Sequence, residues 1–473
     1  MEWAGGTYGL PSSIEQYNNL TITGTGTKTF PNADMTICGD LRIEQSTELL
    51  FGTSTSTYFS LEIYGNTTIG PNAIFSFPSR SRLYLYGNLE RQGNGDFNQE
   101  DLYIITYFQG SIHQELIGDF IDNRKRFNIF YMDNAAGLSV SGNILIYRNQ
   151  GLRLNNGVID NVNNYFELSS TTGLLTNNDN SYITGRMKRL LGSTTGTNNI
   201  NHVFPVGGTK KKNSWLLNPT NTGPWEVEYR QSNPGDNGYD PTSITGDLEA
   251  VSFVEYWVIN GPNTHSAEIK LTLNGTSEVA QTIGWTNRSD LRIVRWNGVA
   301  WEEVGGEPIF TGSSIDNATI TIPISHTFNG SDEFFTIGAI EPVNIPSAQI
   351  TSSNTSLCEG STYTLEVTLT GENPPFEVDY SIGSDSYTET GINNLVHSIN
   401  LSGEFSLGNN IITIDEVRDV TPTVGIILGS SVEVNVYANP TQFLVTSGGN
   451  ICGATTTTIE LSDSESGFTY QLY

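Results

Sequence analysis

The 473-residue sequence contains little charge, and very little of that charge is positive. Asp, Glu, Lys and Arg make up 15% of the chain, with 22 bases against 50 acids and a formal net charge of −28. Soluble domains usually carry about 25% charged residues. A nucleic-acid-binding protein needs a basic surface to displace the counterions of the phosphate backbone. The composition therefore argues against nucleic acid as a partner.

Cysteine and long apolar runs are also scarce. The three cysteines, Cys38, Cys358 and Cys452, are too few for a disulfide framework and do not have the spacing of a zinc site. No run approaches the roughly 18 apolar residues of a membrane helix, so we expect no membrane span. The N-terminal residues MEWAGGTYGL lack the basic and apolar regions of a signal peptide. Either the protein is cytosolic or a signal was removed before residue 1.

Helical periodicity and catalytic motifs are missing as well. None of the five histidines lies in a ligand-spaced pair, and the chain contains no nucleophile elbow or nucleotide-binding glycine motif. The chain instead has 49 Gly, many Asn, Thr and Ser, and short alternating runs bounded by turn residues. These residue types are typical of strands and turns. The sequence therefore predicts an all-β protein.

A loose repeat runs through residues 1–186. The segments ICGDLRIE, IYGNTTIG, LYGNLERQG and VSGNILIYR each place a Gly-Asn or Gly-Asp pair before a strand, at Gly39, Gly65, Gly87 and Gly142. A recurrence of roughly 20–26 residues is typical of a solenoid. We therefore expect a parallel β-helix whose corner glycines need positive φ. Its inward-facing positions would include Leu83, Leu85, Leu152 and Leu154. A large Greek-key sandwich is the alternative.

Residues 187–342 have longer, tryptophan-rich strands such as WEVEYR, VEYWVIN and AEIKLTL. The stretch RWNGVAWEEV predicts a hairpin in which Asn297-Gly298 forms a type I′ turn flanked by Trp296 and Trp301. Seven or eight strands of this kind indicate a β-sandwich.

The remaining residues suggest tandem modules. A proline-containing linker near 341–349 precedes an immunoglobulin-sized sandwich, 343–438, with strands TYTLEVTL, FEVDYSI, NNLVHSINL, NNIITIDEV and SSVEVNVY. Residues 439–473 resemble the start of a further, incomplete repeat, because Cys452 occupies a place similar to that of Cys358. We therefore expect an unpaired edge near 455–473 in a monomer, which a strand from a neighbouring chain could complete.

Two acidic stretches of the sequence suggest calcium as a cofactor. Asp96, Asn98 and Glu100 provide oxygen ligands at alternate positions, as a calcium loop does, and Asp236 and Asp240 form a similar set. Solvated turns are the alternative for both stretches. Otherwise we expect no cofactor.

The basic run Lys210, Lys211 and Lys212 stands out in this acidic chain. One interpretation is a charged loop that protects a strand edge from unwanted pairing. The other is a contact for an acidic glycan or for a neighbouring acidic module, which would favour self-association.

Two blocks of the solenoid region resemble large secreted surface proteins of Bacteroidota. The first contains TYFQGSIHQELIGD and the second contains GLSVSGNILIYRNQGLRLNNGVID. Matching positions in the first block are Phe108, Gly110, Gln114, Ile117 and Gly118. Those in the second are Gly137, Leu138, Gly142, Asn143, Leu152, Leu154, Asn156 and Gly157. The ending GGNICGATTTTIELSDSESGFTYQLY resembles the repeat of gliding-motility adhesins.

The resemblance implies a non-enzymatic adhesin or stalk component at the outer cell surface. Its implied partners are the type IX secretion machinery and extracellular glycans or surfaces. The C-terminal sorting domain of the family is not in this sequence, so we expect a fragment of a longer chain. A polysaccharide lyase or hydrolase on the β-helix is the alternative, but it needs converging acids and bases. A glycan-binding protein without catalysis is another alternative.

Overall fold

The computed structural model is all-β, with 50% strand and 4% helix, as the sequence predicted. The structure describes residues 1–99, 103–122, 125–148, 151–169, 176–192, 202–340, 346–371, 373–420, 425–429, 431–448, 456, 458–467 and 469–471. The chain forms two compact units, Met1–Val343 and Asn344–Tyr473. Among the described residues, no helix has the length and apolar character needed to cross a membrane.

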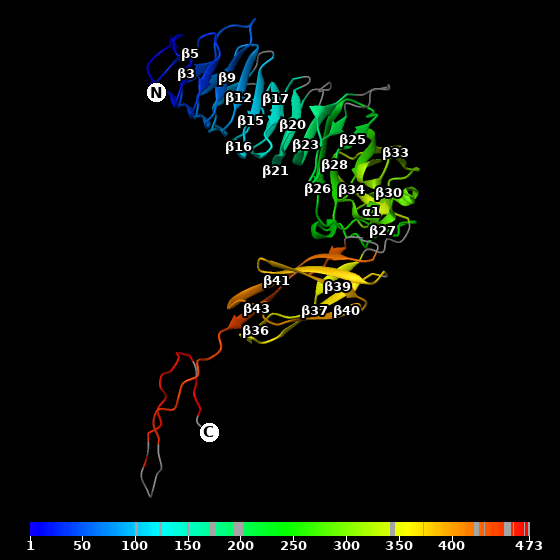
Figure 1. Cartoon of the computed structure of the whole chain (residues 1–473). Helices are drawn as coiled ribbons and strands as arrows, with labels where there is room; N and C mark the ends of the chain where they lie inside the picture. The colour runs from blue at the N-terminus through cyan, green and yellow to red at the C-terminus, as the bar shows by residue number, and fades with distance from the viewer. Residues whose placement is uncertain are drawn as a thin grey trace. The chain divides into compact units, whose positions relative to one another are not determined.

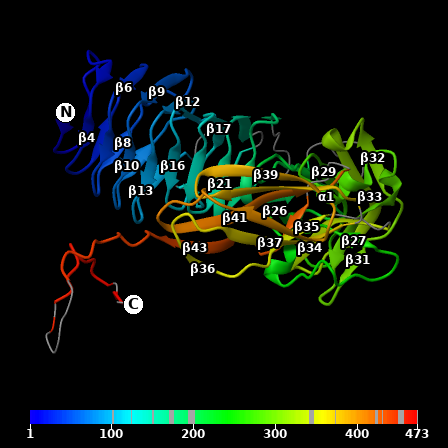
Figure 2. The same cartoon turned by 60° about the horizontal axis from the view of Figure 1, so that its bottom comes forward.

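The first unit begins with a parallel β-solenoid of about 8 turns (Figure 1), which confirms the predicted β-helix. Its coils contribute strands to three sheets. One sheet contains β1 Glu2–Trp3, β4 Leu20–Ile22, β7 Leu41–Ile43, β10 Thr67–Ile69, β13 Leu89–Arg91, β16 Gln114–Ile117, β18 Leu138–Ser141 and β21 Ile159–Leu168, with β19 Ile144–Ile146 beside β21. A second contains β2 Tyr8–Gly9, β5 Thr27–Thr29, β8 Glu48–Leu50, β11 Ile74–Ser76 and β14 Asp96–Asn98. A third contains β3 Gln16–Tyr17, β6 Met35–Ile37, β9 Phe59–Ile63, β12 Ser81–Leu85, β15 Ile105–Gln109, β17 Ile129–Asp133, β20 Leu152–Asn156 and β22 Thr176–Asn177 (Figure 2).

Alternation along each strand fills the interior of the solenoid. Leu83, Leu85, Leu152 and Leu154 are buried, as expected. Phenylalanines stack from coil to coil in the same interior, with ring centroids 6.0 Å apart for Phe30 and Phe51 and 4.7 Å apart for Phe108 and Phe130. Because each coil adds one layer to this column, the solenoid is stabilised by contacts between successive coils.

The repeated glycines are required by close stacking of coils. A β-carbon on Gly87 would lie 2.3 Å from the carbonyl oxygen of Gly65, and one on Gly65 would lie 2.6 Å from that of Gly39. The expectation of positive φ holds for Gly142, at +146°, but is wrong for Gly39, Gly65 and Gly87. Those three positions exclude a side chain because the preceding coil occupies its space, through its backbone at Gly65 and Gly87 and through the Asn19 side chain at Gly39.

The Asn or Asp after each of these glycines forms a hydrogen-bonded ladder. The side-chain oxygen of Asp40 accepts from the amide of Asn66 at 2.7 Å, and that of Asn66 accepts from the amide of Asn88 at 3.0 Å. The ladder also includes Asn143, which accepts from the amide of Tyr165 at 3.1 Å. Each such side chain satisfies a backbone donor of the next coil. The Gly-Asn repeat therefore specifies the stacking of the solenoid.

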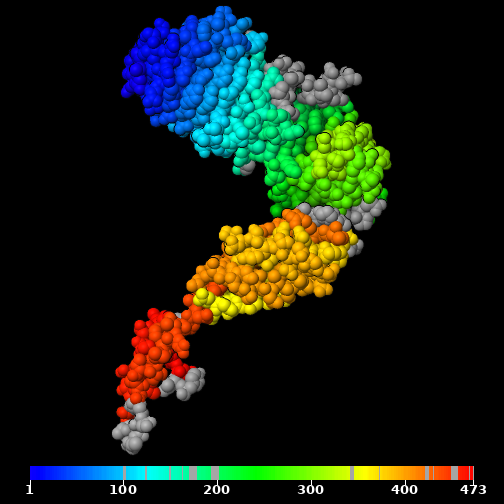
Figure 3. All heavy atoms as spheres, in the orientation of Figure 1, coloured from blue at the N-terminus to red at the C-terminus, as the bar shows by residue number. Residues whose placement is uncertain are grey.

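A sandwich continues directly from the last solenoid coil. Strand β23 Ile183–Leu191 pairs in parallel with β21 and antiparallel with β26, so one 16-stranded sheet passes from the solenoid into the sandwich. The blue solenoid accordingly passes without a gap into the green sandwich (Figure 3). The boundary expected between residues 186 and 187 falls inside β23, which belongs to both parts.

The sandwich has two sheets. The shared sheet continues through β26 Gly223–Arg230, β28 Tyr256–Asn260, β34 Asp332–Ala339, β30 Leu291–Trp296 and β31 Trp301–Glu303, with β27 Ala250–Val251 beside β34. The second sheet contains β24 Val203–Phe204, β25 Ser214–Leu217, β29 Ser266–Leu273, β33 Ala318–Thr327 and β32 Ile309–Gly312. Short helices are η2 Pro234–Asn237, α1 Glu278–Ile283, η3 Arg288–Asp290 and η4 Ile315–Asn317.

The predicted tryptophan hairpin is present, with Trp296 paired opposite Trp301. Its loop has four residues, 297–300, because the Asn297 side chain accepts hydrogen bonds from the amides of Val299 and Ala300. The two-residue type I′ turn was therefore wrong, although Gly298 has the positive φ that the turn motif suggested.

The second unit contains a sandwich with its own apolar core. One sheet contains β40 Val396–Leu401, β37 Tyr363–Thr370, β35 Ser347–Ile350 and β42 Ile426–Ile427. The other contains β36 Thr355–Cys358, β43 Ser431–Tyr437, β41 Gly408–Arg418, β38 Phe376–Ile382 and β39 Asp385–Ile392. Residues such as Leu365, Val378 and Ile412 pack between the sheets. The described residues beyond 438 form no named strand and are linked by one bridge, Val445 to Leu461.

Candidate functional site

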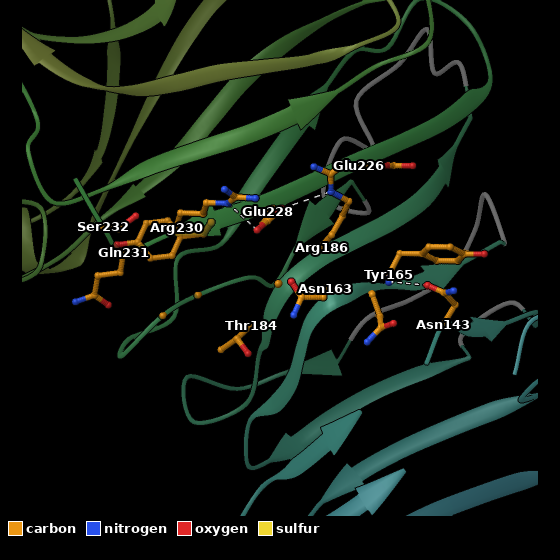
Figure 4. Close-up of a pocket in the computed structure, with 15 residues that line it drawn as sticks. Asn143, Asn163, Tyr165, Thr184, Arg186, Glu226, Glu228, Arg230, Gln231 and Ser232 are labelled. Carbon is orange, nitrogen blue, oxygen red and sulfur yellow. Dashed lines mark hydrogen bonds and ion pairs between the residues drawn. The ribbon is translucent and has the colours of Figure 1, made fainter. Parts of the chain in front are cut away.

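A groove of about 760 Å³ lies where the solenoid meets the sandwich. It opens because the pairing of β21 with β23 shifts register between Asn161 and Tyr165, so that residues 162–164 leave the ladder. Such bulges bend a strand and redirect its side chains. Here the bulge presents Asn163, at φ +71°, to the groove (Figure 4). The side chains labelled in Figure 4 are Asn143, Asn163, Tyr165, Thr184, Arg186, Glu226, Glu228, Arg230, Gln231 and Ser232.

Strand alternation places the charged residues of β26 on one face. Glu226, Glu228 and Arg230 are partly exposed, whereas the intervening Trp225, Val227 and Tyr229 are buried. Because the register pairs Lys188 of β23 with Glu226, the neighbouring Arg186 lies beside Glu228. Strands β28 and β34 continue the polar face of β26, and there Asn260 lies opposite Asp332.

Arg186 is held by three carboxylates. Its Nη2 lies 2.7 Å from Asp332 Oδ2, its Nη1 lies 3.1 Å from Glu226 Oε2, and its Nε lies 3.4 Å from Glu228 Oε2. Arg230 Nε lies 2.8 Å from the other oxygen of Glu228. All three nitrogens of the Arg186 guanidinium therefore already have acidic partners.

The network keeps Arg186 and Asp332 charged. Burial alone would raise the pKa of Asp332, but hydrogen bonds from Arg186 and Asn260 outweigh it and lower that pKa below its usual value. Burial would likewise lower the pKa of Arg186, but Asp332, Glu228 and Glu226 together raise it. The arginine and Asp332 thus remain an ion pair near neutral pH, and this pair is unsuited to exchanging protons with a substrate.

The three lysines of the basic run separate in the structure. Lys210 is exposed and lines a second groove, of about 570 Å³, with Lys211, Asp179 and Asp316. Lys211 donates to the carbonyl oxygen of Asn178, and burial lowers its pKa to about 8. Lys210 is therefore accessible to a partner or glycan, whereas most of the Lys211 side chain is buried.

Lys212 corrects the expectation of a surface contact, because its side chain is fully buried. Its Nζ lies 2.6 Å from Glu255 Oε2, and the Tyr229 hydroxyl donates to the same oxygen at 2.9 Å. A second acid, Glu278, has a buried carboxyl oxygen; its carboxylate accepts from the amide of Phe253 at 2.5 Å, and burial raises its pKa to about 8. One lysine thus faces two acids, and Glu278 retains its proton at neutral pH.

The described positions that were considered for calcium lie in a strand, a short helix and a hydrogen-bonded turn. Asp96 and Asn98 belong to β14, where Asp96 pairs with Ile74 and the intervening Phe97 is buried. Glu100 lies outside the described residues. Asp236 lies in η2, and Asp240 accepts from the amide and hydroxyl of Thr242. Across the described ranges, no group of three or more His, Cys, Asp or Glu residues could hold a metal.

The groove residues Arg186, Glu226 and Glu228, and Asp332 as a partner of Arg186, were not predicted from the sequence. The signal was the alternation of charge with apolar residues in WEVEYR, which we interpreted only as a strand. Neither the partner of Arg186 nor the bulge of β21 is visible from local spacing, because both depend on which strands become neighbours.

Comparison with known proteins leaves the family open. No protein-family model matches the chain, and no curated protein matches it. Among solved structures, the chain is similar to the fibronectin(III)-like modules of CbhA from Clostridium thermocellum. That similarity has 10% identity and a TM-score of 0.17, and it covers 37% of this chain and 88% of the other. A TM-score this low carries no argument, so the sandwich assignment rests on the strand pairing described above.

Proposed function

We propose that this chain is a non-enzymatic component of a secreted cell-surface adhesin or stalk. The observation that carries the proposal is the shared 16-stranded sheet, which joins solenoid and sandwich through continuous hydrogen bonding. A junction of this kind resists bending far better than a flexible linker. Such a unit is suited to holding a contact surface at a distance, and the strongly acidic composition keeps neighbouring copies apart.

The route to the surface rests on the sequence resemblance alone. We propose export by the type IX secretion machinery, an extracellular location at the outer surface, and a role in attachment or gliding. Antibodies against residues 1–343 test the location. They should label intact producing cells, and the labelling should disappear in cells without type IX export. Labelling only after the cells are broken would contradict the proposal.

Adhesion can be measured with beads coated with the whole chain. We expect these beads to remain on polysaccharide-coated or bare surfaces under flow more often than beads coated with an unrelated acidic protein. Equal retention of the two kinds of bead on every surface would contradict a role in attachment.

Processing of a polysaccharide is the alternative function. The observation that favours it is the presence of Glu226 and Glu228 in one groove, since glycosidases use paired carboxylates. Both side chains bind Arg186, however, and a glycosidase also needs one carboxyl group that keeps its proton. Release of reducing ends from neutral or acidic polysaccharides, lost in a Glu228→Gln variant, would replace the adhesin proposal by this one.

A further inference from the structure

We propose that the groove between solenoid and sandwich binds a neutral, hydroxyl-rich oligosaccharide. This inference deepens the proposed function and rests on it, because it assigns one contact of an adhesin to a defined site. The groove volume of about 760 Å³ lies within the range of roughly 300–1,000 Å³ that is typical of small-ligand sites.

The charges of the groove select against an ionic ligand. An anionic sugar would have to approach Glu226 and Glu228, while the Arg186 nitrogens that could attract it already bind carboxylates. A cationic ligand gains little, because Glu226 and Glu228, the carboxylates that line the groove, are already paired with Arg186 and Arg230. A ligand without net charge avoids both costs of desolvation.

The walls also select against a protein segment. None of the described residues that line the groove has an aliphatic side chain, and its aromatic residues are the tyrosines Tyr165 and Tyr229, so an aliphatic side chain of a partner would find no aliphatic pocket. Peptide recognition usually depends on apolar pockets or on a free strand edge. The central strands of this wall, β23 and β26, are paired on both sides within the 16-stranded sheet and offer no such edge.

Hydroxyl groups match what the walls provide. Carboxylate oxygens accept hydrogen bonds, the side-chain amide of Asn163 both donates and accepts, and a sugar hydroxyl can serve either role. Gln231 offers its Nε2 as a donor, because its Oε1 already accepts from the amide and the hydroxyl of Thr209. Asn163 is exposed, and the bulge places it at the groove without a partner strand. We expect this amide to make direct contact with the ligand.

The test is calorimetric titration of the whole chain with neutral gluco-, manno- and N-acetylglucosamine oligosaccharides. Oligogalacturonate and glucosamine oligomers are the charged comparisons. We expect binding to at least one neutral series, with a Kd that changes little between about 50 and 500 mM salt, since no ion pair forms with the ligand. Binding confined to the charged oligomers, or to none, would overturn the proposal.

Two variants locate the binding. Asn163→Gly keeps the left-handed backbone, which glycine adopts freely, and removes the amide. It should weaken binding about fivefold, the effect of losing one neutral hydrogen bond. The matched control is Asn72→Gly, because Asn72 also has a left-handed backbone but lies in an earlier part of the solenoid, away from the groove. This substitution should leave the Kd unchanged. Ser232→Arg should abolish binding by filling the groove. Unchanged affinity in Asn163→Gly and Ser232→Arg would place the ligand elsewhere.

The outcomes separate this inference from the proposed function. If the unmodified chain binds no oligosaccharide, and beads coated with the Ser232→Arg variant still adhere, the groove assignment fails and the adhesin role stands. If oligosaccharides bind the groove but coated beads never adhere, the binding site stands and the adhesin role fails.

Discussion

Arg186 of β23 and Asp332 of β34 lie 146 positions apart in the sequence, yet Nη2 of the arginine is 2.7 Å from Oδ2 of the aspartate. Strands β26 and β28 separate them in the sheet. The ion pair therefore links the last strand shared with the solenoid to a strand in the middle of the sandwich, across two intervening strands. Because this ion pair joins strands that are not neighbours in the sheet, the junction between solenoid and sandwich belongs to one folding unit.

Removing the guanidinium should weaken that junction. In Arg186→Gln the three carboxylates lose their shared partner and repel one another, and we expect the free energy of unfolding of the first unit to fall by about 1–2 kcal/mol. Urea denaturation followed by tryptophan fluorescence measures the change. Arg42→Gln is the matched control, because the Arg42–Glu44 pair is largely exposed and should contribute less than about 0.5 kcal/mol. Equal effects of the two substitutions would show that the network has no special role.

A methyl group in the glycine column should be costly. In Gly87→Ala the β-carbon would lie 2.3 Å from the Gly65 oxygen, so the coils must separate, at a cost of roughly 1–3 kcal/mol. Gly9→Ala has nothing within 4 Å and no positive φ, so it should be neutral or slightly stabilising. Circular dichroism during thermal unfolding compares the two. A stable Gly87→Ala protein would contradict the stacking explanation.

The buried acid Glu278 should make stability depend on pH. Its pKa is raised from the usual 4.5 to about 8, so the folded state holds a proton that the unfolded state releases. The contribution is fully present below about pH 4.5 and is lost as pH rises to 8, with a slope of about 1.4 kcal/mol per pH unit. Glu278→Gln should remove this slope, whereas Glu307→Gln, at an exposed position, should keep it. Urea unfolding at a series of pH values between 5 and 8 provides the measurement.

The second unit should fold without the first. Its sandwich has a separate apolar core, in which residues such as Leu365, Val378 and Ile412 are buried. A fragment of residues 344–438 should therefore unfold cooperatively, at the same temperature as the corresponding transition of the whole chain. Calorimetry of both proteins makes the comparison. A fragment with no cooperative transition would show that the sandwich depends on the rest of the chain.

Strand alternation was sufficient to locate most of the second sandwich. The five strands expected there correspond to β37, β38, β40, β41 and β43. An apolar residue occupies every second position along β37, β38 and β43, whereas in β40 and β41 this alternation covers only part of the strand. Four strands were missed, namely β35, which begins inside the predicted linker, β36, β42 and β39. Strand β39 has the sequence DSYTETGI. It lies at the edge of its sheet and most of its side chains are exposed, so it has no apolar face for a pattern to reveal.

The glycine motif shows a different limit. The recurrence of Gly-Asn and Gly-Asp was enough to predict stacked coils, since only a repeating backbone needs the same pair at each turn. Its physical role was assigned wrongly for Gly39, Gly65 and Gly87, because the clash that excludes a side chain comes from a neighbouring coil some 20 to 26 residues away.

By itself, the sequence determined the all-β class, the solenoid and the positions of most strands, since these depend on residues close together in the chain. Only the tertiary structure decided that Lys212 is buried against Glu255, that Arg186 meets Asp332, and that a bulge opens a groove at Asn163. These features depend on which strands become neighbours in a sheet, and pairing between distant strands leaves no trace in local periodicity.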